Sequence, residues 1–259
     1  MRVLVTFAVD AEFAPWQKSA MLQSAVPLKG SRASSGTRDA YEGNISGASV
    51  RVLITGIGWW NARRAVEMSY ESFKPDICIS SGFAGSLRPE HRPGDILVAR
   101  EVREIKGTRT MRSDNHLLEV ASVHGARVVD CFLGSKRIIR DAREKQHLGA
   151  WGAAVEMESF RIMAAAFGRG IPAVAVRGIS DACDASLPYD FQKATDKNGR
   201  LRVPWLLGQI ARRPKGLPGL IQLGRDSRHT ATKLASFLND FIVALVGIPC
   251  ATGPAKVAV

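Results

Sequence analysis

The chain has 259 residues, 46% of them apolar, and a formal net charge of +12, which allows one large α/β domain with a substantial core or two small domains. Its four cysteines and five histidines show no metal-ligand spacing and no CxxC motif, which excludes a zinc site and a disulfide framework. There is no signal-peptide pattern, and the late apolar run at 241–251 is shorter than the roughly 20 residues of a membrane span, so we expect a soluble cytoplasmic protein.

Predicted strands alternate with predicted helices and loops along the chain. The strands cover residues 2–7, 41–46, 49–55, 76–81, 96–102, 126–133, 153–157 and 173–179. Helices are expected to begin near Pro15 and Trp16 and to cover residues 115–124, 141–148, 159–167, 204–212 and 217–245. Loops are expected at 31–38 and 187–199. No low-complexity linker interrupts the first 190 residues, so we predict one domain over 1–247, with a basic helical part at 190–247 and a loose tail at 248–259.

Pairs of glycines follow two of these strands. Gly56 and Gly58 come after the strand at 49–55, and Gly82 and Gly85 come after the strand at 76–81. Glycine permits φ > 0 and lets the main chain approach another group closely. Asn61 stands where the third glycine of a dinucleotide-binding motif would be, so that motif is incomplete. A ligand contact and a plain helix entry are both open for the first pair.

The stretch at 153–184 organises the rest of the chain. Phe160, Met163, Ala164 and Phe167 lie at i, i+3, i+4 and i+7 and predict one apolar helix face between two apolar strands. A turn at 168–172, with two glycines and a proline, joins that helix to the second strand. The pattern predicts a βαβ unit with parallel strands.

Charged residues mark the ends of these strands. Glu156 and Glu158 lie at the end of the first strand, Arg177 interrupts the second, and Asp181 follows it. Glu12 likewise follows the strand at 2–7. Open α/β sheets bind ligands beyond the carboxyl ends of their strands, so we expect these groups to converge on one cleft. Structural ion pairs are the alternative interpretation.

Three segments carry a family resemblance: GIGWWNA, SSGFAGSLRPEHRPGDILV, and AAVEMES followed by VAVRGISDACD. In order and spacing they resemble the purine nucleoside phosphorylase and nucleosidase superfamily, especially the methylthioadenosine/S-adenosylhomocysteine nucleosidases. The resemblance covers residues 1–184 and implies an α/β fold of three α/β/α layers around a mixed, mostly parallel twisted sheet. It also implies a homodimer that hydrolyses a nucleoside without a cofactor. The tail segment ARRPKGLPGLIQLGRDSR resembles the hopanoid-associated phosphorylase branch, which implies adenine release from adenosylhopane.

The resemblance also implies site residues. Asp181 matches the acid that protonates N7 of a leaving purine, Glu158 the carboxylate that holds the ribose hydroxyls, and Glu12 the carboxylate that activates water, with Arg177 beside them. Charge develops on both base and sugar as the N-glycosidic bond breaks, so acids at both ends stabilise the transition state. Substrate contacts are implied for Met157, Glu156, Phe83, Ala84, Gly85, Ser180, Ile138 and Ile139.

Two residues bear on the choice between water and phosphate. Ser80 and Phe83 stand where phosphorylases of the superfamily carry an arginine and a serine that hold phosphate. An aromatic ring excludes a bulky anion more readily than water, so we expect hydrolysis. A phosphorylase and a methylthioadenosine/S-adenosylhomocysteine nucleosidase remain as alternatives.

A basic segment follows the predicted site. Residues 197–233 hold nine Lys or Arg residues and a single acid, Asp226. Such a run meets anionic lipid, nucleic acid or only solvent. Because interleaved aromatic residues are missing, we expect no nucleic-acid partner and instead peripheral membrane contact through this part. The alternative to an enzyme is a catalytically silent basic binding protein. Such a protein would have no need for charged residues within apolar strands.

Overall fold

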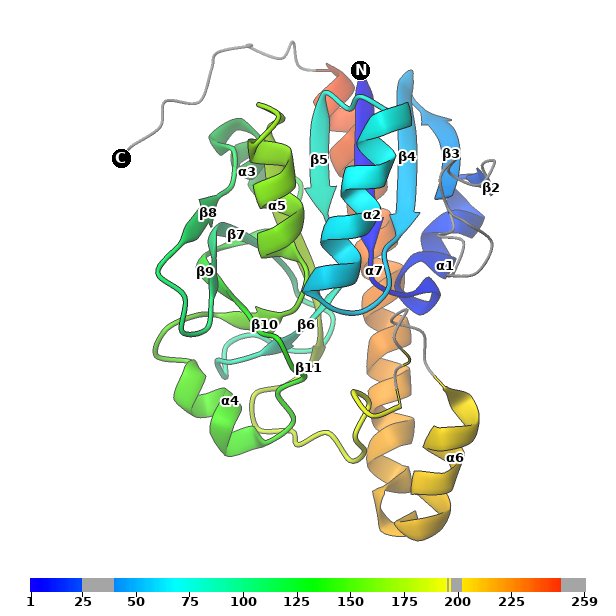
Figure 1. The fold of residues 1–259 in the computed structure, drawn as a ribbon, viewed down its shortest axis with the longest axis vertical. Helices are drawn as coiled ribbons and strands as arrows, with labels where there is room; N and C mark the ends of the chain where they lie inside the picture. The colour runs from blue at the N-terminus through cyan, green and yellow to red at the C-terminus, as the bar shows by residue number, and fades with distance from the viewer. Residues whose placement is uncertain (25–39, 195, 197–201, 248–259) are drawn as a thin grey trace.

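The computed structural model of the protein describes residues 1–24, 40–194, 196 and 202–247 (Figure 1). The predicted loop at 31–38, the tail at 248–259 and part of the predicted irregular region at 187–199 lie outside these residues.

One mixed 11-stranded sheet forms the centre of the described part of the chain. Its strands are β1 (Arg2–Phe7), β2 (Gln23–Ser24), β3 (Ala40–Ile45), β4 (Ala48–Ile54), β5 (Ile77–Ser80), β6 (Phe83–Ser86), β7 (Ile96–Glu104), β8 (Thr110–Arg112), β9 (Arg127–Gly134), β10 (Ala154–Glu156) and β11 (Ala173–Asp181). Their order across the sheet is β2-β3-β4-β1-β5-β11-β6-β10-β9-β7-β8, with a further β11–β7 pairing. Parallel pairs slightly outnumber antiparallel ones, as the sequence predicted.

Helices cover both faces of the sheet and complete the three layers (Figure 1). They are α1 (Asp10–Ser19), α2 (Trp59–Ser72), α3 (Asn115–Val123), α4 (Ala142–Leu148), α5 (Ser159–Phe167), α6 (Val203–Arg212) and α7 (Leu217–Gly247), with a 3₁₀ turn, η1, at Pro214–Gly216. Helices α2 and α5 pack together on one face, whereas α1 and α3 pack with α7 on the other.

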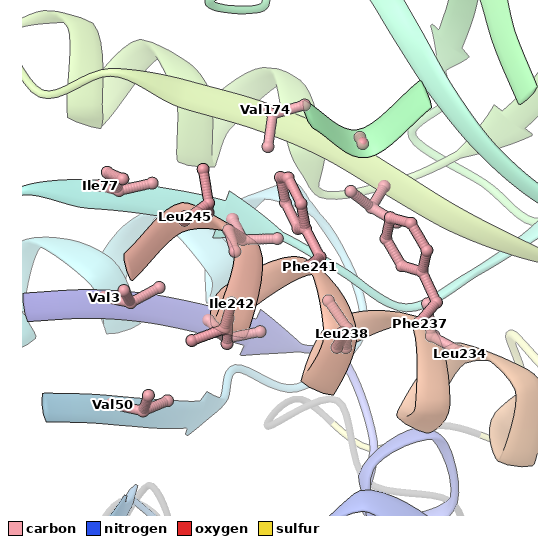
Figure 2. Close-up of a cluster of buried hydrophobic side chains, with 14 of the residues drawn as sticks. Val3, Val50, Ile77, Val174, Leu234, Phe237, Leu238, Phe241, Ile242 and Leu245 are labelled. Atoms are coloured by element: carbon pink, nitrogen blue, oxygen red, sulfur yellow. The ribbon is translucent and has the colours of Figure 1, made fainter. Parts of the chain in front are cut away.

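Strand alternation divides the apolar residues between these two faces. Val3, Val5 and Phe7 of β1 belong to the cluster under α7, and Leu4 belongs to the cluster under α2 and α5. Helix α7 contributes a stripe at helical spacing, formed by Leu234, Leu238, Phe241, Ile242 and Leu245 (Figure 2). The two clusters fix the strand ends that carry the candidate site.

The first helix begins earlier than the sequence predicted. Helix α1 starts at Asp10, and Pro15 lies inside it rather than at its first turn. The carboxylate of Glu12 accepts hydrogen bonds from the main-chain N–H groups of Ala8 and Val9 and so completes the helix start at this earlier point.

The predicted parallel βαβ unit is wrong in its pairing. Strands β10 and β11 flank α5, but they do not pair with each other. Strand β6 lies between them, parallel to β11 and antiparallel to β10. The segment that forms β6 was expected to be a glycine-rich loop, and its two strand partners leave no room for direct β10–β11 pairing.

The basic C-terminal part extends beyond the sheet. Helix α6 has no buried residue, and with the first turns of α7 it projects from the body (Figure 1). The stretch 214–247 is long and apolar enough to cross a membrane by composition, yet 50% of its most apolar window is buried within the protein. Its second half is therefore a core helix, and only its first half is free to meet another surface.

Candidate active site

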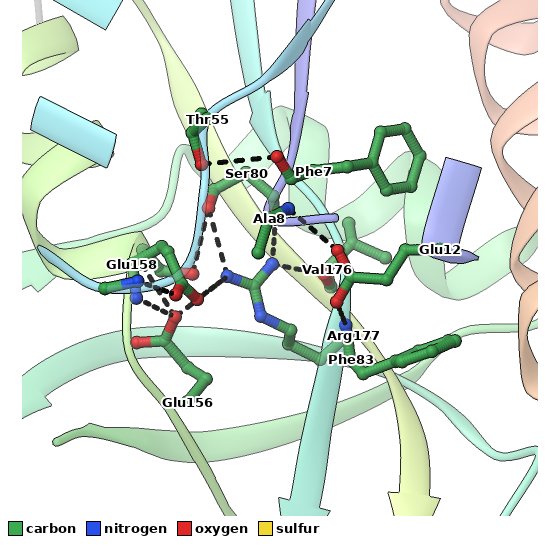
Figure 3. Close-up of polar contacts among 12 residues, drawn as sticks. Phe7, Ala8, Glu12, Thr55, Ser80, Phe83, Glu156, Glu158, Val176 and Arg177 are labelled. Carbon is green, nitrogen blue, oxygen red and sulfur yellow. Dashed lines mark hydrogen bonds and ion pairs between the residues drawn. The ribbon is translucent and has the colours of Figure 1, made fainter. Parts of the chain in front are cut away.

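A buried arginine anchors the site. Arg177, in the middle of β11, is 1% exposed. Its Nη2 lies 2.8 Å from Oε2 of Glu156 and 3.9 Å from Oε2 of Glu158, as Figure 3 shows. Its Nη1 donates to the main-chain carbonyls of Ser80 and Val176 at 2.9 and 3.0 Å. One guanidinium therefore joins the ends of β5 and β10 to the middle of β11.

Glu156 serves mainly to hold the arginine. Its Oε2 also accepts the N–H groups of Glu158 and Ser159, at 2.9 and 2.7 Å, where α5 begins. A helix start favours negative charge, so this carboxylate is fixed by a helix end and a guanidinium together. Its Oε1 has no hydrogen-bond partner among the described residues. The structural ion pair that the sequence left open is present here, and only Oε1 remains for a substrate contact.

Glu158 is held from the other side of the cleft. Gly58, with φ of 98°, donates its N–H to Oε1 of Glu158 at 2.7 Å. The first glycine pair of the sequence thus binds a protein carboxylate. Burial and the nearby Glu156 carboxylate raise the pKa of Glu158 to about 8, although the Arg177 charge opposes the rise. Glu158 therefore favours its protonated form at neutral pH.

Glu12 is fixed by three main-chain N–H groups. Its Oε2 accepts from Ala8 and Val9 at 2.7 and 3.2 Å, and its Oε1 accepts from Phe83 at 2.8 Å. Burial raises the pKa of this carboxyl, although the Phe83 N–H and the Arg177 charge oppose the rise. A carboxylate with a raised pKa is a stronger base, which suits the predicted activation of water.

Asp181 ends β11 and is held by three neighbours. The Ser180 hydroxyl donates to its Oδ1 at 2.7 Å, and the ammonium of Lys145, from α4, donates to its Oδ2. A Cβ added at Gly85 would lie 3.0 Å from Oδ2, so the carboxylate packs directly on this glycine. Lys145 is fully buried and has no counterpart in the sequence predictions. Its signal is weak in sequence, because a lysine between Glu144 and Gln146 in a short polar helix is typical of a solvated surface.

The second glycine pair separates two acids. A Cβ at Gly82, where φ is 136°, would lie 3.0 Å from Oε1 of Glu12, just as Gly85 meets Asp181. Gly82 directly precedes β6 and Gly85 lies within it, so the two acids pack against the same short segment of chain.

The other predicted substrate residues differ in their exposure. Met157 and Phe83 are partly exposed, whereas Ala84 is buried and its carbonyl oxygen lies 3.3 Å from the Ser180 hydroxyl oxygen. In Figure 3 the Phe83 ring points away from the Glu156 and Glu158 carboxylates. Phe83 contacts Glu12 through its main-chain N–H.

The two isoleucines differ in their surroundings. Ile139 is 5% exposed and packs in a small core cluster with Leu87 and Leu133. Ile138 is partly exposed, and its N–H donates to the Gln192 side chain at 3.1 Å. Of the pair, Ile138 is the residue with surface left to contact a ligand.

The raised pKa of Glu158 predicts that the stability of the fold depends on pH. Glu158 has an ordinary pKa of 4.5 when unfolded and about 8 when folded, so its neutral form stabilises the fold fully below pH 4.5, and this contribution is lost as pH rises towards 8. We expect Glu158→Gln to gain stability relative to wild type between pH 5 and 8 in urea unfolding. The exposed Glu71→Gln is the control and should show no such trend. A Glu158→Gln difference that is constant with pH would contradict the buried, protonated state.

Among the described residues, no group of three or more His, Cys, Asp or Glu side chains is arranged to hold a metal ion.

Comparison with protein families gives a match to the phosphorylase superfamily over residues 3–207. The chain belongs to this superfamily. Among its superfamily relatives, a 5′-methylthioadenosine/S-adenosylhomocysteine nucleosidase of Exiguobacterium sp. is 30% identical over 181 residues, covering 58% of this chain and 76% of the relative. A nucleosidase of the same description from Actinobacillus succinogenes is 28% identical over 203 residues, covering 68% and 86%. These relatives confirm the predicted enzyme class, a nucleosidase-type hydrolase.

Solved structures of the superfamily confirm the predicted fold. Futalosine hydrolase of Helicobacter pylori matches with a TM-score of 0.71 at 16% identity, covering 93% of this chain and 97% of that one. The 5′-methylthioadenosine/S-adenosylhomocysteine nucleosidase of H. pylori, solved with butyl-thio-DADMe-Immucillin-A, matches with a TM-score of 0.70 at 17% identity over the same shares.

Proposed function

We propose that the protein hydrolyses the N-glycosidic bond of a 5′-substituted adenosine and releases adenine, with adenosylhopane of hopanoid biosynthesis as its natural substrate. The observation that carries the reaction is the placement of Glu12 at Gly82 and Asp181 at Gly85. Glu12 activates water at the sugar and Asp181 delivers a proton to N7 of the base. Glu158 holds the ribose hydroxyls and Met157 packs on the ribose face.

Water is favoured over phosphate as the nucleophile because the basic group in the site is already paired with a carboxylate. The Ser80 hydroxyl lies 3.0 Å from that of Ser159, and the Arg177 guanidinium is paired with Glu156. Three carboxylates beside that guanidinium repel a further anion. Among the described residues near Glu12, we find no unpaired cation that would hold phosphate, which argues against the phosphorylase alternative.

A hydrophobic 5′ group is supported by aromatic residues at the ribose end. Trp59 and Trp60 follow Gly58, which binds Glu158, and Trp60 is 61% exposed. An exposed indole ring so close to the Glu158 contact favours an apolar substituent. The resemblance of the tail to the hopanoid-associated branch points to the same kind of substrate. The smaller substituent of methylthioadenosine fits the same acids and is the second candidate.

The experiment compares adenosines that differ only at the 5′ position. Purified protein is given adenosine, methylthioadenosine, adenosylhomocysteine and a long 5′-alkyl adenosine, and adenine is followed by chromatography. We expect kcat/KM to be highest for the 5′-alkyl compound. A preference for methylthioadenosine or adenosylhomocysteine would replace the proposed substrate by that of the curated relatives.

We also propose that the protein is a cytoplasmic homodimer that touches anionic membrane through α6 and the start of α7. Exposed apolar residues on this projection lie beside a basic cluster. The apolar residues are Val203, Leu207, Leu217 and Ile221, and the basic ones are Arg212, Arg213 and Lys215. Light scattering tests the dimer.

Flotation with vesicles tests the membrane contact. We expect binding to vesicles that contain phosphatidylglycerol and little binding to neutral ones, because basic residues near a surface contribute about 1 kcal/mol each. Changing Arg212, Arg213 and Lys215 to Glu should abolish flotation. The same charge change at the exposed residues Lys18, Arg64 and Lys74 should leave most of it. Equal loss in both triple variants would show only a nonspecific charge effect and would contradict docking by α6.

A further inference from the structure

Lys145 is a buried charge that the reaction as described above does not use. Its side chain is 0% exposed, and its ammonium makes three hydrogen bonds: to Oδ2 of Asp181, to the carbonyl of Ala182 at 3.1 Å and to the carbonyl of Ala185 at 2.7 Å. A fully buried ammonium costs several kcal/mol unless it is paired. Its partner is the residue that must protonate the leaving base.

Asp181 accepts at both of its oxygens. Ser180 donates to Oδ1 and Lys145 to Oδ2, which is the pattern of an ionised carboxylate. In this arrangement Asp181 carries no proton of its own for N7. The neighbouring group with a proton to give is the ammonium of Lys145.

The hydrogen bonds of Lys145 are compatible with giving up one proton. A neutral amine keeps two N–H donors, which is the number needed for the carbonyls of Ala182 and Ala185. Its lone pair then faces the newly protonated Asp181. The transfer therefore leaves no buried polar group unsatisfied.

We propose that Lys145 is the proton reservoir of the reaction and recharges Asp181 during each turnover; this rests on the proposed function. As the C1′–N9 bond breaks, its electron pair goes to the purine, Lys145 passes its proton to the Asp181 carboxylate, and Asp181 passes a proton to N7. Asp181 is then ionised again, and Lys145 is a neutral amine. Water bonds to C1′ and loses a proton to Glu12, which returns it through solvent to Lys145. One water is consumed, and neutral adenine leaves.

Other titratable groups surround the pair. Cys183 and Asp184 lie in the segment after β11, and Glu90 lies in the loop before β7. Asp184, Lys145 and Glu90 all interact electrostatically with Cys183. On α4 itself, Glu144 is paired with Arg137. Asp181 is the described acid in direct contact with the ammonium.

The test uses two variants of Lys145 and two substrates. Lys145→Met removes the charge, and Lys145→Gln keeps a hydrogen-bond donor but has no proton to transfer. With the 5′-alkyl adenosine we expect both to lower kcat at pH 8 at least tenfold, with KM within threefold. Because solvent must then supply the proton in place of Lys145, the loss of kcat should be larger at alkaline than at acid pH.

A 4-nitrophenyl riboside gives the matched control substrate, since its leaving phenolate needs no proton. We expect both variants to cleave it within threefold of wild type, and the exposed Lys74→Met to behave as wild type with both substrates. A loss that is equal for both substrates and at all pH values would assign Lys145 a structural role only. A wild-type pH profile of kcat in Lys145→Gln would show that Lys145 acts only as a hydrogen-bond donor. Wild-type protein that cleaves the riboside but no adenosine would overturn the proposed function instead.

Discussion

Replacement of Asp181 by Asn is expected to lower kcat by about 10² to 10⁴, because the amide cannot carry a proton to N7 and general acid catalysis typically contributes that much. KM should stay within a few fold, since the side chain keeps its size and its place on Gly85. Adenine release from the 5′-alkyl adenosine measures both constants. The exposed strand residue Asp130, changed to Asn, is the matched control.

The same variant should also lose stability. Lys145 is fully buried, and the neutral amide introduced by Asp181→Asn leaves its ammonium without a counter-charge. Removing one partner of a buried pair costs about 3 to 5 kcal/mol. The double variant Lys145→Met/Asp181→Asn should recover much of this stability while remaining inactive towards the adenosine. A stable and active Asp181→Asn would contradict both the acid and the ion pair.

Replacement of Glu12 by Gln is the second change with a large expected effect. The amide keeps the shape of the side chain but cannot accept a proton from water, so we expect kcat to fall by about 10² to 10⁴. One of the N–H groups from Ala8, Val9 and Phe83 then faces the amide NH₂, a lost hydrogen bond worth about 1–3 kcal/mol.

Azide separates loss of the base from loss of the fold in this variant. As a nucleophile that needs no deprotonation, it should restore adenine release by Glu12→Gln and yield a ribosyl azide. Asp10→Asn, an exposed acid in the same helix turn, should keep wild-type activity. If Glu12→Gln keeps more than a third of wild-type turnover, water is activated by another group.

The parts of the site that lie at the ends of central strands could be predicted from the sequence. Glu12, Glu158 and Arg177 interrupt or follow apolar runs, and the structure brings these three charges to one cluster. The helix α5 and the hydrophobic stripe of α7 also follow from their spacing. Local patterns of this kind are visible because burial imposes a strict period on each element.

What the sequence did not predict depends on contacts distant along the chain. Strand β6 has four residues, of which Gly85 is one, and it follows Gly82. It forms only because β10 and β11 supply partners on both sides. The glycines at 82 and 85 were expected to approach a ligand, whereas they make room for Glu12 and Asp181. Lys145 meets an acid 36 positions away. No local pattern encodes either contact.

The identity of the sugar product tests hydrolysis most directly. Wild-type protein is incubated with the 5′-alkyl adenosine, with and without excess phosphate, and adenine and sugar are followed by liquid chromatography and mass spectrometry. We expect equal adenine release in both samples and a free 5-substituted ribose in each. A sugar 1-phosphate, formed only when phosphate is present, would show that the nucleophile beside Glu12 is phosphate and would contradict hydrolysis.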